Sequence, residues 1–293
     1  MTWAVRTTDA VDPRAGEFGA AVVIPAASCP CEQVEAVRPQ LLEDGCLIVV
    51  WNGPREPSHD CSQRVLARGA AVWLEFPGRI GAAAARNQGA AWLSGRASVL
   101  AFVDADDIAY PDWLSHLREP LVAGAADLAG GPLELTSQGR TYKVEPGHDF
   151  WHRQALYGSN LAVTREGWAR LGGFHSGVGT CEDTDLAWRA GDLGLRIELV
   201  RTAVVRYSLR HGWAEWRQRV TWGRSSVSLL RAHGLSLSTH LPNLRGLVRH
   251  KRSHGFASSP LIAGLGQYAG QWAGRLLDSV PAAQDGPSRS VPL

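Results

Sequence analysis

The stretch SVLAFVDADD, residues 98–107, contains the pattern that decides the fold. Its first six residues are almost all apolar, which is typical of a strand buried on both faces of a parallel sheet. Asp104, Asp106 and Asp107 follow this strand directly. Ligands of α/β proteins bind at the carboxyl ends of the parallel strands, so the pattern predicts a binding site at this acidic turn.

Apolar runs of similar length precede this stretch and alternate with helical patterns. Alternation at this spacing indicates βαβ units and a parallel sheet. The region after residue 107 predicts shorter elements and a long final helix. The predicted strands are 20–25 (AAVVIP), 46–51 (CLIVVW), 72–76 (VWLEF), 98–103, two short strands within 127–144 and 196–207; the predicted helices are 33–42, 81–94, 164–171, 181–190 and 213–232.

The composition is that of an ordinary globular protein, with 293 residues, 45% hydrophobic and 20% charged. This length suits one large α/β domain with a tail. The five cysteines are odd in number and form no CxxC pair, which favours a reduced, cytoplasmic setting. Residues 1–18 lack the apolar core of a signal peptide, and no apolar run reaches the ~18 residues that span a bilayer.

Charge is distributed unevenly along the chain. Residues 1–200 hold 17 basic and 25 acidic residues, a net charge of −8, whereas residues 201–252 hold 11 basic residues against Glu215 alone, a net charge of +10. A basic stretch after an acidic body indicates contact with an anion, and a solvated basic surface is the alternative. We expect no nucleic-acid role, because the acidic body would repel phosphate backbones.

The Asp-Ala-Asp turn at 104–106 is a candidate metal site. Two carboxylates separated by one residue can face one cation where the chain leaves a strand. Mg²⁺ and Mn²⁺ prefer such oxygen ligands, often together with substrate phosphates. The alternative is an acidic turn in which Asp107 caps a following helix.

A second acidic cluster, Glu182, Asp183 and Asp185, lies about 80 residues downstream. A carboxylate at a helix start can act as a general base that takes the proton of a hydroxyl group. The alternative is simple helix capping. Arg86, in the middle of a predicted helix, could bind a phosphate or carboxylate through paired hydrogen bonds, or could be an ordinary exposed arginine.

Taken together and in order, these segments resemble the family 2 glycosyltransferases of the GT-A fold. The resemblance spans residues 19–232. It is carried by six segments: AAVVIP (20–25), VVWNGP (49–54), GAAAARNQG (81–89), FVDADD (102–107), GSN with GGF (158–160 and 172–174), and EDTDLAWR (182–189). The order of the six matches is more specific than any one of them.

The resemblance implies a fold, a reaction and residue roles. The fold would be a Rossmann-like mixed sheet flanked by helices, with a nucleotide-binding half (19–107), an acceptor half (108–210), an N-terminal extension (1–18) and a C-terminal extension (233–293). The reaction would be inverting transfer from a nucleoside diphosphate sugar with Mg²⁺ or Mn²⁺. The implied roles are Asp183 as base, Glu182 shaping the acceptor site, Asp104 and Asp106 at the metal, Pro25, Ala26, Trp51, Asn52, Arg86, Asp104 and Ala105 at the nucleotide sugar, and Ser159, Asn160 and Asp185 on the acceptor side.

Two departures from the family pattern matter. Trp51 stands where the family has an aspartate that grips the base, so Asn52 would replace that aspartate or Trp51 would stack on the base. After the first strand, Ala26, Ala27 and Ser28 offer few hydrogen-bonding groups. Alternatives are therefore a degenerate nucleotide-sugar-binding protein and a nucleotidyltransferase, although no Gly-rich basic loop follows the first strand.

The acceptor predicted from the sequence is a saccharide, a lipid-linked molecule or a small molecule, in cell-envelope polysaccharide or natural-product glycosylation. Residues 217–224 carry arginines that could hold the donor diphosphate. Arg245, Arg249, Lys251 and Arg252 could instead meet anionic lipid, which would place a cytoplasmic protein at the membrane periphery.

Overall fold

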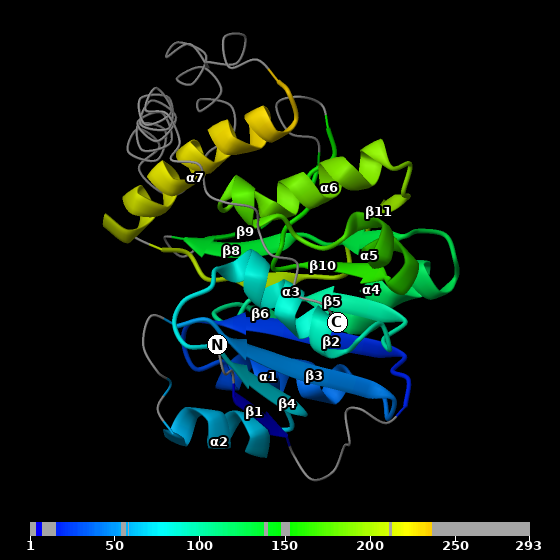
Figure 1. Ribbon diagram of the computed structural model, residues 1–293, viewed down its shortest axis with the longest axis vertical. Coiled ribbons are helices and arrows are strands. Elements are labelled where there is room, and N and C mark those ends of the chain that lie inside the picture. The colour runs from blue at the N-terminus through cyan, green and yellow to red at the C-terminus, as the bar shows by residue number, and fades with distance from the viewer. Residues whose placement is uncertain are drawn as a thin grey trace. The chain divides into compact units, whose positions relative to one another are not determined.

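The computed structural model describes residues 4–7, 16–53, 57, 59–137, 140–147, 153–210 and 213–235 (Figure 1). The chain divides into two compact units, and each is described by itself. The first unit comprises residues 1–176 and 182–209, and the second comprises residues 177–181 and 210–293. The predicted lipid contact at Arg245, Arg249, Lys251 and Arg252 lies outside the described residues.

An eight-stranded mixed sheet forms the centre of the first unit. Its order is β1-β4-β3-β2-β5-β10-β7-β11, and the four strands β4, β3, β2 and β5 run parallel. β10 is antiparallel to both β5 and β7. The strands are β1 (Ala4–Thr7), β2 (Ala20–Ala26), β3 (Gly45–Trp51), β4 (Val72–Glu75), β5 (Val99–Phe102), β7 (Leu128–Gly130), β10 (Leu161–Thr164) and β11 (Ile197–Leu199). The predicted α/β class is confirmed.

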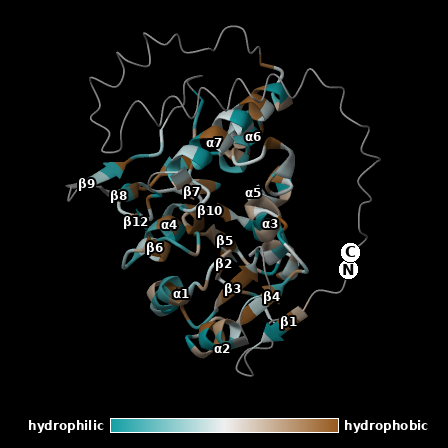
Figure 2. Ribbon diagram, turned by 90° about the vertical axis from the view of Figure 1, so that its left-hand side faces the viewer, coloured by the Kyte–Doolittle hydropathy of each residue, from teal (hydrophilic) through white to brown (hydrophobic). Residues whose placement is uncertain are grey.

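Helices cover both faces of this sheet, so its central strands β2, β3 and β5 are apolar throughout. In β2, Val22 and Ile24 pack on one face and Ala21 and Val23 on the other, and Figure 2 shows the hydrophobic colour of β2 and β3. One face is covered by α1 (Cys31–Val37), α2 (His59–Ala67) and α4 (Trp113–Val122); the other is covered by α3 (Ala82–Trp92), α5 (Arg165–Leu171) and α6 (Glu182–Asp192).

The predicted helix at 33–42 begins earlier and changes its winding at the proline. α1 starts at Cys31, and residues Arg38–Gln40 form the 3-10 turn η1 around Pro39. A proline removes a backbone donor from the α-helical pattern, which explains the end of α1 at Val37.

Helix α3 approaches the sheet closely at Gly89. A Cβ placed there would lie 2.4 Å from Val23 Cγ1 and 3.1 Å from Val50 Cγ2. We predict that Gly89→Ala lowers the free energy of unfolding by about 1–3 kcal/mol, because the helix must shift away from the strands. Urea unfolding measures this change.

A matched control for this prediction is Gly191→Ala in α6, where no atom lies within 4 Å of the added methyl. That variant should keep or raise stability, since alanine is the better helix former by about 0.5–1 kcal/mol. Equal effects of the two substitutions would contradict the packing argument.

A four-stranded sheet, ordered β6-β12-β8-β9, completes the first unit. Its strands are β6 (Ile108–Ala109), β8 (Leu133–Ser137), β9 (Arg140–Val144) and β12 (Val205–Tyr207). The prediction of one strand over 196–207 is wrong, because β11 pairs with β7 in the large sheet whereas β12 pairs with β8 in the small one. The chain passes between sheets at Gly131, where an added Cβ would lie 1.9 Å from Ala203 O.

The cysteines also differ from expectation. Cys29, after β2, and Cys61, in α2, form a disulfide across 32 residues. The expectation of reduced cysteines is therefore wrong for this pair, because spacing along the chain does not reveal which loops lie side by side. Cys31 and Cys46 are not in this disulfide, and burial raises the pKa of Cys46 to about 12.

The second unit has one described helix, α7 (Trp213–Ala232), which has the bounds predicted from the sequence. Within this unit Ser225 Oγ accepts hydrogen bonds from the Thr180 backbone N–H and hydroxyl, both at 3.0 Å. These bonds fasten residues 177–181 to the helix. No helix in the described part of the chain is long and apolar enough to cross a membrane.

Candidate functional site

The pairing of β10 beside β5 gathers the predicted site at one edge of the large sheet. Leu161, the first residue of β10, pairs with Phe102, the last residue of β5. The acidic turn after β5 and the GSN segment before β10 therefore lie at the same edge. This edge is also where the parallel strands β2 and β3 end, as expected for a ligand site in an α/β sheet.

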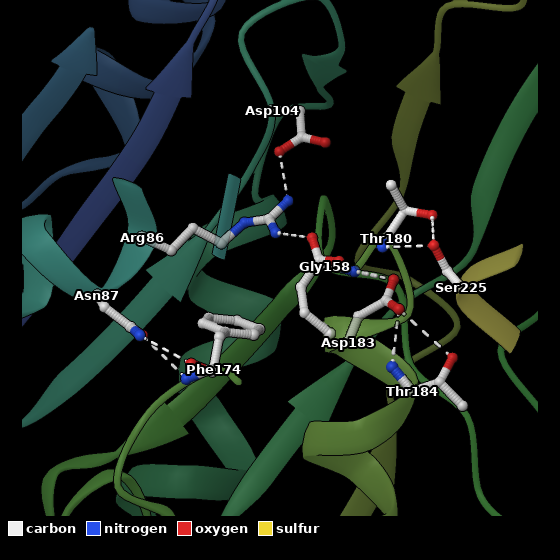
Figure 3. A network of polar contacts seen from close by, with 10 residues as sticks. Arg86, Asn87, Asp104, Gly158, Phe174, Thr180, Asp183, Thr184 and Ser225 are labelled. Atoms are coloured by element: carbon white, nitrogen blue, oxygen red, sulfur yellow. Dashed lines mark hydrogen bonds and ion pairs between the residues drawn. The ribbon is translucent and has the colours of Figure 1, made fainter. Parts of the chain in front are cut away.

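Arg86 joins the two acidic motifs (Figure 3). Its Nη2 lies 2.6 Å from Asp104 Oδ1 and its Nη1 lies 2.8 Å from Glu182 Oε1. The residue is only 2% exposed. Burial lowers the pKa of Arg86, but the charges of Asp104 and Glu182 outweigh this effect and raise it above the ordinary value. The arginine is thus a permanently charged link between segments 96 residues apart.

Asp183 is held by backbone groups on both carboxylate oxygens (Figure 3). Oδ2 accepts from the Gly158 N–H at 2.9 Å, and Oδ1 accepts from the Thr184 N–H at 2.7 Å. Burial raises the pKa of Asp183, and the bond from Gly158 and the charge of Arg86 oppose the increase only in part. A carboxylate with a raised pKa and a fixed orientation is suited to accept a proton.

Glu182 shares this environment. Its pKa is raised by burial, and the positive charge of Arg86 opposes that increase. The first turn of α6 therefore contains two neighbouring carboxyl groups with different hydrogen-bond partners. Glu182 is engaged with Arg86, whereas Asp183 is engaged with main-chain N–H groups.

Phe174, in the GGF segment, fixes the helix that carries Arg86. The Arg86 guanidinium carbon lies 5.3 Å from the centre of the Phe174 ring. Asn87 Nδ2 donates to Phe174 O at 2.8 Å, and Phe174 N donates to Asn87 Oδ1 at 2.9 Å (Figure 3). The ARN and GGF motifs are therefore joined by two hydrogen bonds between Asn87 and Phe174 and by the contact of Arg86 with the Phe174 ring.

The turn after β5 concentrates negative charge. Asp104 is partly exposed, Asp106 is exposed and Asp107 is buried. Burial, together with the charges of Asp104 and Asp106, raises the pKa of Asp107 to about 8, although the Ser208 N–H donates to Asp107 Oδ1 at 3.0 Å. Adjacent carboxylates that disfavour each other's ionisation provide a suitable environment for a cation.

The donor set at this turn fits a divalent ion that is also coordinated by a substrate. Among the described residues, no group of three or more His, Cys, Asp or Glu side chains is arranged to hold a metal alone. Mg²⁺ commonly binds through one or two carboxylates and completes its shell with water and substrate phosphates. Asp104 and Asp106 therefore stay predicted ligands of such an ion.

The predicted nucleotide-pocket residues line the ends of β2 and β3. Pro25 and Ala26 are the last residues of β2, and the Asn52 N–H donates to Ala26 O at 2.6 Å. Trp51 is buried and stacks on Trp73 with ring centres 5.6 Å apart. Its ring is therefore packed within the core, and stacking on a base stays a prediction.

The Asn52 side chain orders the loop before α3. Its Oδ1 accepts from the N–H groups of Ile80 and Gly81 at 2.9 and 2.8 Å. Asn52 is 5% exposed. The side-chain oxygen of Asn52 is therefore occupied by the loop before α3, and its contact with a base stays a prediction.

The predicted acceptor-side residues are buried. Ser159 is 5% exposed. Asn160 accepts from Trp113 Nε1 at 2.8 Å and donates to Pro132 O and Ala203 O at 2.9 and 2.8 Å. These contacts use its carbonyl oxygen and its amide nitrogen. Asn160 thus connects α4 with the chain segments between the two sheets.

Asp185 is likewise engaged inside the fold. Its Oδ2 accepts from Arg189 Nε at 2.8 Å and lies 3.3 Å from His175 Nδ1. Arg189 also donates to Leu171 O and Gly173 O. This set holds α6 against the end of α5, so Asp185 positions the acidic turn of α6.

Two residues near Asp183 received no role from the sequence. Gly158 contributes its N–H to Asp183, and a Cβ there would lie 3.0 Å from Arg86 Nη2. Tyr157 is half-buried, and burial followed by the charge of Asp183 raises its pKa to about 12. The signal for Gly158 was its place in the GSN segment, whereas nothing marked Tyr157.

Comparison with known proteins bears on the fold and the family. The profile of glycosyl transferase family 2 matches residues 47–175. A mannosyltransferase, PcManGT from Pyrobaculum calidifontis, solved with GDP-Man and Mn²⁺, is similar at 18% identity and a TM-score of 0.58, over 97% of this chain and 80% of that one. No curated protein matches the sequence.

Two further solved structures are similar. A mycobacterial protein aligns at 22% identity and a TM-score of 0.55, over 77% of this chain and 78% of that one. GalNAc-T7, solved with UDP, GalNAc and Mn²⁺, aligns at 16% identity and a TM-score of 0.57, over 90% of this chain but only 58% of that one. The fold is thus that of the GT-A glycosyltransferases. Within that fold, residues 47–175 match the profile of glycosyl transferase family 2.

Proposed function

We propose that this protein is an inverting glycosyltransferase that moves a sugar from a nucleoside diphosphate donor to an acceptor hydroxyl. The observation that carries the proposal is Arg86, which connects the turn at Asp104 with the pair Glu182 and Asp183. This link supports a site in which Asp104 acts on the phosphate side of the donor and Asp183 acts as the base. A purely structural turn would not need a buried arginine shared between the two motifs.

In the proposed reaction, Asp183 accepts the proton of the acceptor hydroxyl as that oxygen attacks the anomeric carbon. The backbone bonds from Gly158 and Thr184 keep the carboxylate oriented toward one direction of approach. Glu182 and Arg86, which are paired with each other, lie beside the Asp183 carboxylate in this proposal. A displacement from the face opposite the departing diphosphate inverts the anomeric centre.

Asp104 and Asp106 would hold Mg²⁺ or Mn²⁺ beside the donor diphosphate. When bound, such an ion offsets the negative charge that develops on the departing phosphate. The solved relatives PcManGT and GalNAc-T7 contain Mn²⁺ together with GDP-Man and with UDP, respectively. This supports metal use but leaves the choice of ion and base to experiment.

The proposed donor is a nucleoside diphosphate sugar, and the proposed acceptor is a saccharide, a lipid-linked molecule or a small molecule. Titration calorimetry with UDP-, GDP- and dTDP-sugars, with and without Mn²⁺, followed by product analysis tests both the class and the donor. Metal-dependent binding with transfer and inversion supports the proposal. Binding without turnover would favour a nucleotide-sugar-binding protein, and nucleotidyl transfer would overturn it.

Asp106→Ala tests the metal site. We expect this variant to lose at least about 100-fold in kcat and to lose the Mn²⁺ dependence of nucleotide binding, because one of two carboxylate ligands is gone. Calorimetry with UDP or GDP at several Mn²⁺ concentrations measures the change. Asp60→Ala in α2, an exposed carboxylate, is the control and should behave as wild type. Unchanged Mn²⁺ dependence in Asp106→Ala would remove this residue from the metal site.

A further inference from the structure

The exposed face of α7 has a distinct composition. Along this 20-residue helix, the solvent-exposed positions include Trp213, Arg217, Thr221, Arg224 and Ser228. Their spacings of three and four residues place them on one side of the helix, within about 80° of arc. Gly223, Val227 and Leu230 are buried on another side.

Trp213 is the most exposed large hydrophobic residue of the described chain, with 77% of its surface open. Its ring meets Trp216 edge to face, with centres 5.5 Å apart. An indole at this exposure loses hydrophobic stabilisation unless another surface covers it. Tryptophan, like tyrosine, is enriched where proteins meet the headgroup layer of a membrane.

The charges on this face have one sign. Arg217 and Arg224 form no ion pair with a described residue. The one acidic residue of α7, Glu215, lies 3.8 Å from Arg219. Two arginines separated by two helical turns, with a tryptophan at the start of the same face, complement a flat anionic surface better than a pocket for one phosphate.

We propose that this exposed face of α7, defined by Trp213, Arg217, Thr221, Arg224 and Ser228, docks on an anionic lipid bilayer. The helix would lie in the plane of the headgroups, with its arginines at lipid phosphates and its first tryptophan inserted among them. The described helix is not apolar enough to cross the bilayer. Docking is therefore shallow, reversible and sensitive to salt. This inference does not depend on the proposed reaction.

Vesicle co-sedimentation of the full chain tests the proposal. The probe is phosphatidylcholine vesicles with and without about a third phosphatidylserine, at low and high NaCl. We expect binding only to the anionic vesicles and a decrease with salt. Since each basic residue near such a surface contributes about fivefold in partitioning, Arg217→Gln with Arg224→Gln should weaken binding by about 25-fold. Trp213→Ala should weaken it further.

A charge-matched control is Arg64→Gln with Arg201→Gln, which removes two exposed arginines of the first unit. It should bind vesicles like wild type, and circular dichroism should show that all variants are folded. The proposal is overturned if wild type ignores anionic vesicles, or if the control loses as much binding as the α7 variant. A triple variant with Arg217→Gln, Arg224→Gln and Trp213→Ala that still binds fully would also overturn the proposal. Two further results would do the same: a dimer that depends on Trp213, or binding to RNA in preference to vesicles.

Discussion

Replacing Asp183 with Asn is expected to lower kcat for sugar transfer by about 10²–10⁴-fold, the usual contribution of a positioned general base. The amide cannot take the acceptor proton, and it cannot accept from both Gly158 N–H and Thr184 N–H as the carboxylate does. Donor binding should change little, since the loss concerns the acceptor step. Initial rates with a matched donor and acceptor, together with calorimetry for the donor, measure the two effects.

The pH dependence of the transfer rate distinguishes a catalytic base at Asp183 from a residue with a structural role only. Because burial raises its pKa, the wild-type rate should rise with pH through a value above the ordinary carboxyl range. The residual activity of Asp183→Asn should lack that rise. Asp192→Asn, an exposed residue of the same helix, is the control and should keep the wild-type profile. A wild-type rate in Asp183→Asn would assign the base to another group.

Replacing Arg86 with Met is expected to be the most destabilising of these changes. It leaves Glu182 buried and Asp104 partly buried without their cationic partner, and breaking a buried pair costs about 3–5 kcal/mol. Transfer activity should be lost as well, because Asp104 and Glu182 are no longer held together. Urea unfolding and steady-state kinetics measure the two losses.

The pH dependence of this loss has a defined sign. Arg86 lowers the pKa of Glu182 in the folded protein, so without Arg86 that pKa should rise further and the folded state should take up a proton more readily than the unfolded state. The deficit in stability is then largest above the raised pKa of Glu182 and shrinks as pH falls through it. Arg64→Met, which removes an exposed arginine paired with Asp60, should cost less than about 1 kcal/mol at any pH. Equal costs for the two variants would contradict the role given to Arg86.

Local patterns predicted most of the elements that bear the site. The apolar runs at 20–25, 46–51, 72–76 and 98–103 correspond to β2, β3, β4 and β5, since strands buried on both faces need apolar residues throughout. The predicted 213–232 helix has the bounds of α7. By contrast, α2 and α4 received no prediction, although their patterns bury residues such as Val65 and Leu117.

The sequence could not reveal contacts between distant segments. Arg86 looked equally like an exposed helix residue, because its partner Glu182 lies 96 positions away. The engagement of Trp51 with Trp73, and of Asn160 with Trp113, depends on which strands and helices become neighbours. The order of the motifs could be predicted from the family resemblance. Which of their side chains are buried in the interior could not, because burial depends on the packing of distant segments.

The insertion of β10 between β5 and β7 determines when the polar centre can form during biosynthesis. β2, β3, β4 and β5 have left the ribosome before residues 161–164 are made, so this half can condense while Arg86 has only Asp104 as a partner. Contacts of large sequence separation form late, because the intervening loop must first be closed. A chain arrested before α6 would therefore contain Arg86 and Asp104 without Glu182 and Asp183. The proposed site is thus complete only after Glu182 has reached Arg86.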